Sequence, residues 1–412
     1  MQTRKAKFIL LAIAFVFVMF FTNDFGLIDV EKTSIITAIA IDYEDDGEYT
    51  VTAQIAVPEA TDTNSENLKA QLSGKGSTVG AAIKNLGDLS GWYPKLSFCN
   101  LILIGNGFDS YNVIKVLDYF AKTLRVQDSA LIAMSEKKAS ELLEIASPLD
   151  NISSFAMQKV MFKNPGFDRD VAATNIKTFC SDHYASAKSS YMPLIKVVSS
   201  DDGQSSDEEG NASGSSSSES GMDTGSSGGS GGQEAAKKSN YLFDAKTTAL
   251  FLDGVKVGEL DENLSLVFNS LNGPFEGTTF SVDDVPYGES KSNYLLTVMS
   301  SKPCVNVLAD HNSLELKINL DLYCKIIDQN ADNSDQALSE NKPLPLAVKN
   351  KAEELLNGWL KDLVETSRQT GCDFLKIKEK LYRYNHKQYS RYEKNYLSVM
   401  KTHLKVTVFG QK

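Results

Sequence analysis

Apolar residues at the start of the body of the chain follow strand-like patterns. Residues 35–41 form an apolar, β-branched run, and residues 49–57 alternate between apolar and polar side chains. Asp46 and Gly47 lie between the two runs. Glycine tolerates the positive φ that a tight hairpin turn requires. These residues therefore predict an opening β-hairpin.

The pattern then changes repeatedly between strand and helix. The apolar runs 101–104 and 130–134 are strand-like, and apolar residues at helical spacing follow them in 111–124 and 139–146. This order is typical of an α/β-type subdomain. Further elements expected in this region are a helix through 82–86 capped by Ser77, helices near 155–162 and 171–179, and a strand at 194–198.

The second half begins with another expected hairpin, in which Asp253-Gly254 joins 248–252 to 255–260. Residues 314–322 alternate strictly, which predicts an antiparallel sheet with one face in solvent. Apolar residues from Val348 to Leu363 predict a long amphipathic helix. The other elements expected here are helices at 262–270 and 374–381 and strands at 294–299 and 404–408.

The N-terminal segment has the pattern of an export signal or a signal-anchor. Arg4, Lys5 and Lys7 precede an apolar run from Phe8 to Phe21 that continues to Thr22. Its 14 apolar residues are fewer than the roughly 20 of a full transmembrane helix. A thinned or tilted span, a cleaved signal and a buried core helix remain alternatives. The expected anchor residues are Phe8, Leu10, Ile13, Phe15, Phe17 and Phe20.

Together these patterns predict an α+β fold with multiple mixed or antiparallel β-sheets, packed helices and an N-terminal membrane helix. We expect an anchor at 1–30, an α/β region at 31–198 that has one or two subdomains, and an α+β domain at 241–412. The segment 199–240 between them is rich in Ser, Gly and acidic residues. Such a composition cannot bury enough apolar surface to order the backbone, so we expect a disordered linker or insertion.

The acidic charge is concentrated in that segment. Residues 199–236 contain eight acidic residues and no Lys or Arg, so they supply −8 of the net −11 and leave −3 for the rest. A basic stripe interleaved with aromatic residues is missing from the sequence, so nucleic-acid binding is not expected.

Residues that would carry catalysis or bind a metal or cofactor are not arranged in known motifs. The five cysteines form no CxxC pair, and the four histidines are not at metal-ligand spacing. The sequence 74–77 (GKGS) lacks the upstream glycine of a phosphate loop, and 105–107 (GNG) lacks the third glycine of a dinucleotide fingerprint. We therefore expect no catalytic, metal or cofactor site. The cysteines are expected to be buried, with one Cys304–Cys324 disulfide as an alternative.

Tyrosines are dense near the C-terminus, at Tyr382, Tyr384, Tyr389, Tyr392 and Tyr396. Packing against the terminal sheet is one interpretation. The other is a partner-binding surface that includes Tyr389, Tyr392 and Tyr396, because tyrosines are enriched at protein interfaces.

Four segments resemble the Ger(x)C family, the C subunits of germinant receptors in endospore-forming bacteria. They are the opening hairpin 35–58; the strands and helices of 101–143; the hairpin of 248–260, with Thr248-Ala249-Leu250-Phe251 and Lys256-Val257-Gly258-Glu259-Leu260; and the C-terminal helix, Asp373-Phe374 and final strand. Family members carry a lipobox cysteine, whereas the first cysteine here is Cys99. Phe8–Thr22 would then replace the lipid anchor.

The resemblance implies a non-catalytic receptor subunit on the outer face of the inner spore membrane. It would assemble with A-type and B-type membrane subunits in the response to nutrients. The alternative is a tethered extracytoplasmic solute-binding protein or cell-envelope hydrolase. A solute-binding protein should have an apolar cleft between lobes, and a hydrolase should have a nucleophile–base contact or perturbed carboxylates.

Overall fold

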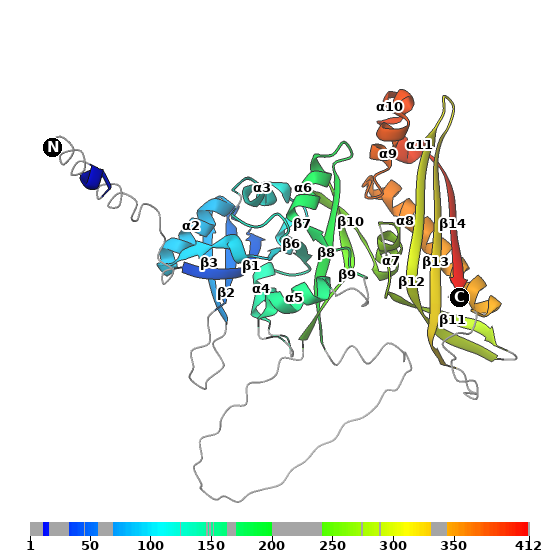
Figure 1. Cartoon of the computed structure of the whole chain (residues 1–412), viewed down its shortest axis with the longest axis horizontal. Coiled ribbons are helices and arrows are strands. Elements are labelled where there is room, and N and C mark those ends of the chain that lie inside the picture. The colour runs from blue at the N-terminus through cyan, green and yellow to red at the C-terminus, as the bar shows by residue number, and fades with distance from the viewer. Residues whose placement is uncertain are drawn as a thin grey trace, which may run out of the picture.

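The computed structural model confirms a mixed α+β fold with more than one sheet and packed helices (Figure 1). The structure describes residues 11–15, 33–44, 46–56, 69–123, 125–145, 147, 150, 152–162, 170–199, 241–272, 275–287, 290–330 and 344–410. A ten-stranded sheet and a four-stranded sheet form its framework.

The first sheet has a parallel centre and antiparallel edges. Its main path is β10-β9-β8-β6-β5-β1-β2-β3, with β4 beside β1 and β7 beside β6. Neighbouring strands from β1 through β5 and β6 to β8 are parallel. The bounds are β1 Thr33–Tyr43, β2 Tyr49–Ala56, β3 Lys69–Gly76, β4 Tyr93–Lys95, β5 Leu101–Ile104, β6 Leu131–Ser135, β7 Thr174–Asn175, β8 Ser189–Ser199, β9 Tyr241–Leu252 and β10 Val255–Leu260.

Both predicted hairpins are confirmed in this sheet: β9–β10 lies at one edge, and β1–β2 lies one strand in from the other. Strands β1 and β2 pair antiparallel around Gly47, and β9 and β10 pair antiparallel around Gly254. Both glycines have positive φ, at 82° and 80°, which is the backbone conformation that the turn dipeptides predict.

Helices cover both faces of the first sheet, so it is the middle of three layers. Figure 1 shows α3 and α6 on one side and α4 and α5 on the other. Alternate residues of β1 supply the two cores: Ile39 and Ile41 pack with the first layer, and Ala38 and Ala40 with the second. The helices are α2 Val79–Ser90, α3 Ile114–Thr123, α4 Ala139–Glu144, α5 Ser153–Met161 and α6 Ile176–Tyr184.

The first sheet contains strands from both sides of the segment 199–240. Strand β9 pairs antiparallel with β8 from Ser189↔Leu252 to Ser199↔Tyr241. Leu250 and Leu260 also belong to the core under the second sheet. Residues 200–240, which we expected to form a disordered linker or insertion, lie outside the described residues.

The second sheet follows the order β11-β12-β13-β14 and is mixed. The antiparallel sheet predicted for residues 314–322 is correct for β12–β13 and wrong for β13–β14, which is parallel. Helices α8 to α11 lie between these two strands in the sequence, and β14 returns alongside β13 in the same direction. The bounds are β11 Thr279–Tyr287, β12 Ser290–Ala309, β13 Leu314–Asn330, β14 Lys401–Gly410, α7 Glu262–Leu271, α8 Leu346–Thr370, α9 Ile377–Tyr384, α10 His386–Tyr392 and α11 Tyr396–Val399.

Two local predictions are wrong. The N-cap of α2 is Thr78 rather than Ser77, because the Ala81 N–H donates to Thr78 Oγ1 at 3.1 Å. The helix expected at 171–179 begins only at Ile176, after the short strand β7. Its N-cap is Asn175, whose Oδ1 accepts from the Thr178 N–H.

Only part of the expected anchor lies within the described residues. Residues 11–15 are helical, and the side chains of Ile13 and Phe15 are exposed. Phe8, Leu10, Phe17 and Phe20 lie outside the described residues. Within the described part of the chain, no helix has both the length and the hydropathy needed to cross a bilayer.

Candidate interaction surface

Four exposed apolar side chains lie close together in the sequence at and just after the C-terminal end of α2. Leu89 is 80% exposed, and the exposed fractions of Trp92, Tyr93 and Phe98 are between 41% and 50%. Leu89 is in α2, Tyr93 in β4 and Phe98 in the short 3-10 helix Leu96–Phe98, and Trp92 lies between α2 and β4. We call these four residues the α2–β4 edge. Scattered exposed apolar residues are ordinary, whereas a contiguous group is typical of interaction sites.

The local sequence explains why this edge protrudes. Helix α2 ends at Gly91, which has a φ of 70° and donates its N–H to Gly87 O. This left-handed C-cap is the conformation that glycine adopts most easily. The chain then turns directly into β4, whose residues Tyr93–Lys95 pair in parallel with the first three residues of β1. Ser34 Oγ also donates to Tyr93 O at 3.3 Å.

A cavity of about 570 Å³ adjoins this edge. One face of α2 forms its floor, because Gly80 and Gly87 are seven residues, or about two turns, apart. A Cβ on Gly80 would lie 2.9 Å from the Tyr119 ring, and one on Gly87 would lie 3.2 Å from Pro94 Cδ. The lining residues are Gly80, Ile83, Lys84, Gly87, Asp88, Gly91, Trp92, Tyr93, Pro94, Tyr119 and Arg125.

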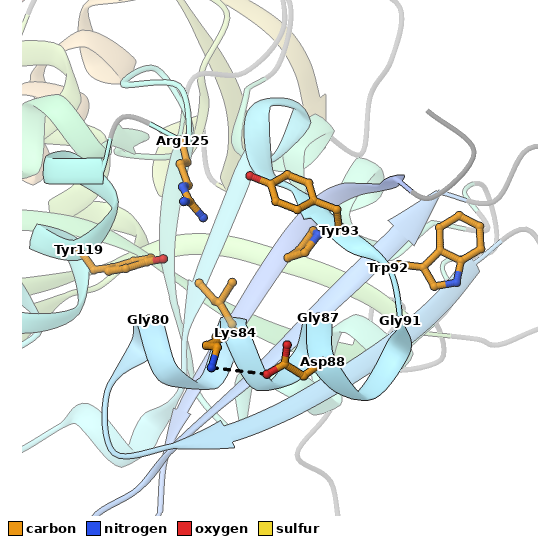
Figure 2. Close-up of a pocket in the computed structure, with 11 residues that line it drawn as sticks. Gly80, Lys84, Gly87, Asp88, Gly91, Trp92, Tyr93, Tyr119 and Arg125 are labelled. Carbon is orange, nitrogen blue, oxygen red and sulfur yellow. Dashed lines mark ion pairs between the residues drawn. The ribbon is translucent and has the colours of Figure 1, made fainter. Parts of the chain in front are cut away.

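Charged and aromatic groups face this cavity from opposite sides. Figure 2 shows Tyr119 and Arg125 reaching toward the space above α2, with Tyr93 on the other side. Lys84 and Asp88 form an ion pair of 3.7 Å on the helix surface. Arg125 is exposed and has no ion-pair partner among the described residues. Its guanidinium is therefore available to a phosphate or carboxylate group of a partner.

The arrangement is suited to binding. A hydrolase site requires a nucleophile within hydrogen-bond reach of a base. The lining residues contain no Ser, Thr, Cys or His to supply such a pair. The cavity lies along one face of α2 beside β4 (Figure 2), and is not the cleft between lobes expected of a solute-binding protein.

A second notable site is the buried carboxylate of Asp373, between α8 and α9. Its oxygens accept hydrogen bonds from the N–H groups of Ile377 and Lys378, both at 2.8 Å, and from Tyr396 Oη at 3.1 Å. Burial raises the pKa of Asp373 to about 6, although these donors oppose the shift. The carboxylate thus caps α9 and orders Tyr396.

The same segment connects the C-terminal helices to the first sheet. The Asp373 N–H donates to Ser189 Oγ at 2.8 Å, and Cys372 Sγ lies 3.3 Å from Phe251 O. Lys376 also forms a 2.7 Å ion pair with Asp182 of α6. These contacts make Asp373 a structural group that joins two parts of the fold.

Of the two interpretations of the C-terminal tyrosines, packing holds for Tyr392 and Tyr396, and a partner-binding surface is wrong for these two. Tyr392 and Tyr396 are buried, and Tyr389 packs against the same core. Tyr392 Oη donates to Asp310 O, so the hydroxyl groups are used within the fold. Tyr382 and Tyr384 are the exposed members.

The expectation of buried cysteines is confirmed for Cys99, Cys180, Cys324 and Cys372, whereas Cys304 is exposed. All five are free. The alternative Cys304–Cys324 disulfide is wrong because the register of β12 and β13 pairs Cys304 with Asn319 and Cys324 with Val298.

The glycine-containing sequences have packing roles. A Cβ on Gly74 would lie 2.4 Å from Ala82 O, so this glycine lets β3 approach α2 closely. A Cβ on Gly105 would lie 2.0 Å from Asp42 Oδ1. Asp42 accepts from the Ala139 and Ser140 N–H groups and caps α4. Among the described residues, no group of three His, Cys, Asp or Glu side chains could hold a metal ion.

Sequence reasoning missed the α2–β4 edge. Residues 92–95 are too short and too mixed for a strand pattern, and β4 exists only because it pairs with β1. The spacing of Gly80 and Gly87 was a signal that one face of α2 lacks a side chain at two positions that are two turns apart. The adjacent pair Trp92-Tyr93, which includes one of two tryptophans in the chain, was another.

Two family models match this chain in order. The model described as the spore germination protein N-terminal domain matches residues 27–197. The model described as spore germination B3/GerAC like, C-terminal, matches residues 246–409. No curated protein matches the chain.

A crystal structure of the GerBC protein is similar to this chain. The two are 12% identical with a TM-score of 0.46, and the match covers 93% of this chain and 100% of that chain. Given that low similarity, the family assignment depends on the two family models. Because together they cover most of the sequence, the chain belongs to the Ger(x)C family of spore germination proteins, the family of germinant receptor C subunits.

Proposed function

We propose that this chain is a non-catalytic, membrane-anchored subunit of a nutrient germinant receptor, which assembles with A-type and B-type membrane subunits. Its body is extracytoplasmic, at the inner membrane of the spore. The observation that carries this proposal is the ordered match of both family domains across residues 27–197 and 246–409.

The N-terminal sequence supports the membrane part of the proposal. Arg4, Lys5 and Lys7 precede the apolar run Phe8–Thr22. Positive residues at one end of an apolar run favour retention of that end in the cytoplasm, so the chain that follows the run is exported. No cysteine precedes Cys99, so the run takes the place of a lipid attachment near the N-terminus.

The exposed surface supports a role in assembly. The α2–β4 edge offers aromatic rings beside a cavity that contains Lys84 and Arg125. Aromatic residues and Arg are enriched in interfaces. The buried Asp373 is used for capping α9 and for joining the two parts of the fold.

The membrane anchor can be tested with charged substitutions in the apolar run. Ile13→Asp with Phe17→Asp places two carboxylates in the run, and each costs about 2.5–3.5 kcal/mol at the centre of a membrane helix. The matched control is Ile13→Leu with Phe17→Leu. The host is a spore former that carries the A-type and B-type genes and lacks its own copy of this gene.

The charged variant should lose membrane fractionation and nutrient-triggered germination together, while the Leu variant should retain both. A trigger that bypasses nutrient receptors should still germinate both kinds of spore. Normal nutrient germination after complete deletion of the gene would refute the receptor role. Membrane retention of the doubly charged variant would refute the anchor.

A further inference from the structure

We propose that the α2–β4 edge rests in the headgroup region of an anionic phospholipid bilayer. The four apolar side chains of the edge would enter the interface, and Lys84, Lys95 and Arg125 would contact lipid phosphates. This inference rests on the proposed membrane anchoring and assigns a lipid-facing surface to the folded body.

The side chains of the edge have the chemistry of membrane interfaces. Leu89, Trp92, Tyr93 and Phe98 are all more than two-fifths exposed, although large apolar residues gain free energy by leaving water. Trp and Tyr combine an apolar ring with a polar group, and both are enriched where hydrocarbon meets water. Leu89 comes from the end of α2, Tyr93 from β4 and Phe98 from the 3-10 helix, and Trp92 lies between α2 and β4.

The charge of the same surface is complementary to an anionic bilayer. Lys84, Lys95 and Arg125 carry three positive charges, and Asp88 carries one negative charge, so the balance is +2 at pH 7, in contrast to −11 for the whole chain. Lys95 Nζ lies 5.6 Å above the Phe98 ring. Basic residues close to a membrane surface are attracted to anionic lipids.

The cavity beside the edge provides a place for a headgroup. Arg125 and Lys84 both line it, and its volume is about 570 Å³. The guanidinium fork of Arg matches the geometry of phosphate oxygens. Tyr119 and Tyr93 close two sides of the same space (Figure 2).

The start of the folded body fixes where this edge lies relative to the anchor. Strand β1 begins at Thr33, which is paired with Tyr93 of the edge. The apolar run ends at Thr22. The ten residues between them, 23–32, make eleven Cα-to-Cα steps, which reach at most about 40 Å even when extended. The α2 end of the body, opposite the second sheet in Figure 1, is therefore the end held near the bilayer.

Depth-dependent fluorescence quenching tests this placement on the full chain. The chain has two tryptophans, and Trp359→Phe leaves Trp92 as the sole reporter. This variant is reconstituted into nanodiscs of phosphatidylglycerol and phosphatidylcholine, with or without bromine on the acyl chains near the headgroup. Trp92 emission should fall roughly twofold with brominated lipid, because an interfacial ring contacts the upper acyl chain.

Two further chains serve as controls. Trp92→Phe retains Trp359, which is partly buried and packs 6.3 Å from Phe280 between ring centroids, so its emission should not change with bromine. The second control chain carries Phe in place of both native tryptophans and the substitution Tyr384→Trp. Its single tryptophan lies on α9, in the second half of the fold. That reporter should also be unaffected. If Trp359→Phe lowers stability, the difference between the wild type and Trp92→Phe gives the same signal.

The outcomes separate this inference from the anchor. Equal Trp92 emission in brominated and ordinary nanodiscs, in a chain that floats with the nanodiscs, would overturn the lipid contact and leave the anchor standing. Failure to float would refute the anchor. Quenching that A-type and B-type subunits abolish would also overturn the lipid contact, since the edge would then be a protein interface in the receptor. Quenching that is stronger in anionic than in purely zwitterionic nanodiscs supports the proposal.

Discussion

At the scale of single residues, Asp373 is the least exposed acidic side chain among the residues that the structure describes. It is 1% exposed, and its carboxylate accepts two backbone N–H groups and one tyrosine hydroxyl. Burial raises its pKa to about 6, above the ordinary value near 4. The carboxylate of Asp373 therefore binds a proton more tightly in the folded chain than in the unfolded chain.

This shift predicts a pH dependence of stability. The contribution of the Asp373 proton to the free energy of unfolding is fully present below about pH 4, the pKa in the unfolded chain. It is lost as the pH rises through about 6, the pKa in the folded chain. Two pKa units correspond to about 3 kcal/mol. Asp373→Asn should remove this slope, because the amide does not titrate. Urea unfolding of the full chain in detergent at pH 4, 5, 6 and 7 measures how the free energy of unfolding changes with pH.

The exposed residue Asp362 supplies the matched control, because it is also in the C-terminal half. Asp362→Asn should retain the wild-type slope between pH 4 and 6. Parallel stability curves for Asp373→Asn and the wild type would show that the buried carboxyl does not control this dependence.

At the scale of elements, the sequence predicts strands and helices well where one strong pattern dominates. The hairpins around Gly47 and Gly254 and the helix α8 are confirmed. Strand β3 was missed, because KAQLSGKG contains two glycines and few β-branched residues, and it forms by pairing with β2. Strand β11 was missed because Asp283, Asp284 and Pro286 disturb its pattern, with a register shift between Val282 and Val285.

The same limit explains what could be predicted of the candidate surface. Helix α2 was expected from its apolar face, Ala82, Ile83 and Leu86. Gly80 and Gly87, two turns apart on the same helix, could be recognised as a packing surface only from Tyr119 and Pro94, which lie against them. Those residues come from other elements, so only the tertiary structure brings them together. Conversely, density of tyrosine suggested a surface where Tyr392 and Tyr396 are in fact core residues.

Two glycine substitutions test how β3 packs on α2. Gly74→Ala places a Cβ 2.4 Å from Ala82 O and 2.7 Å from Leu86 N, both backbone atoms that cannot rotate away. We expect a loss of roughly 1–3 kcal/mol in the free energy of unfolding, the usual cost of overpacking. Chemical denaturation of the full chain in detergent is the measurement.

Gly358→Ala is the control on the exposed side of α8, where a new Cβ has nothing within 4 Å. It should raise the free energy of unfolding by roughly 0.5–1 kcal/mol, because Ala is a better helix former than Gly. Equal effects of both substitutions would contradict the close contact between β3 and α2.

At the scale of the whole molecule, the two sheets share a packed body in which most thiols are inaccessible. Burial raises the pKa of Cys99, Cys324 and Cys372 to about 12 and that of Cys180 to about 11. Cys304 is exposed on β12. Thiolates are the reactive form, so only Cys304 should react quickly.

Mass spectrometry after brief maleimide treatment should thus find one label on the native chain and five on the unfolded chain. Cys304→Ser should reduce the native count to zero. Rapid labelling of any second cysteine in the native chain would indicate that the cores are more open than the structure describes.

The central claim is that the whole chain acts as a membrane-anchored subunit of a germinant receptor. The most direct measurement is affinity purification of the C-terminally tagged chain from detergent-solubilised inner spore membranes, followed by quantitative mass spectrometry. The account predicts recovery of the A-type and B-type subunits in comparable molar amounts, and loss of both with the Ile13→Asp, Phe17→Asp variant. Recovery of the tagged chain from the soluble spore fraction, without either subunit, would contradict it.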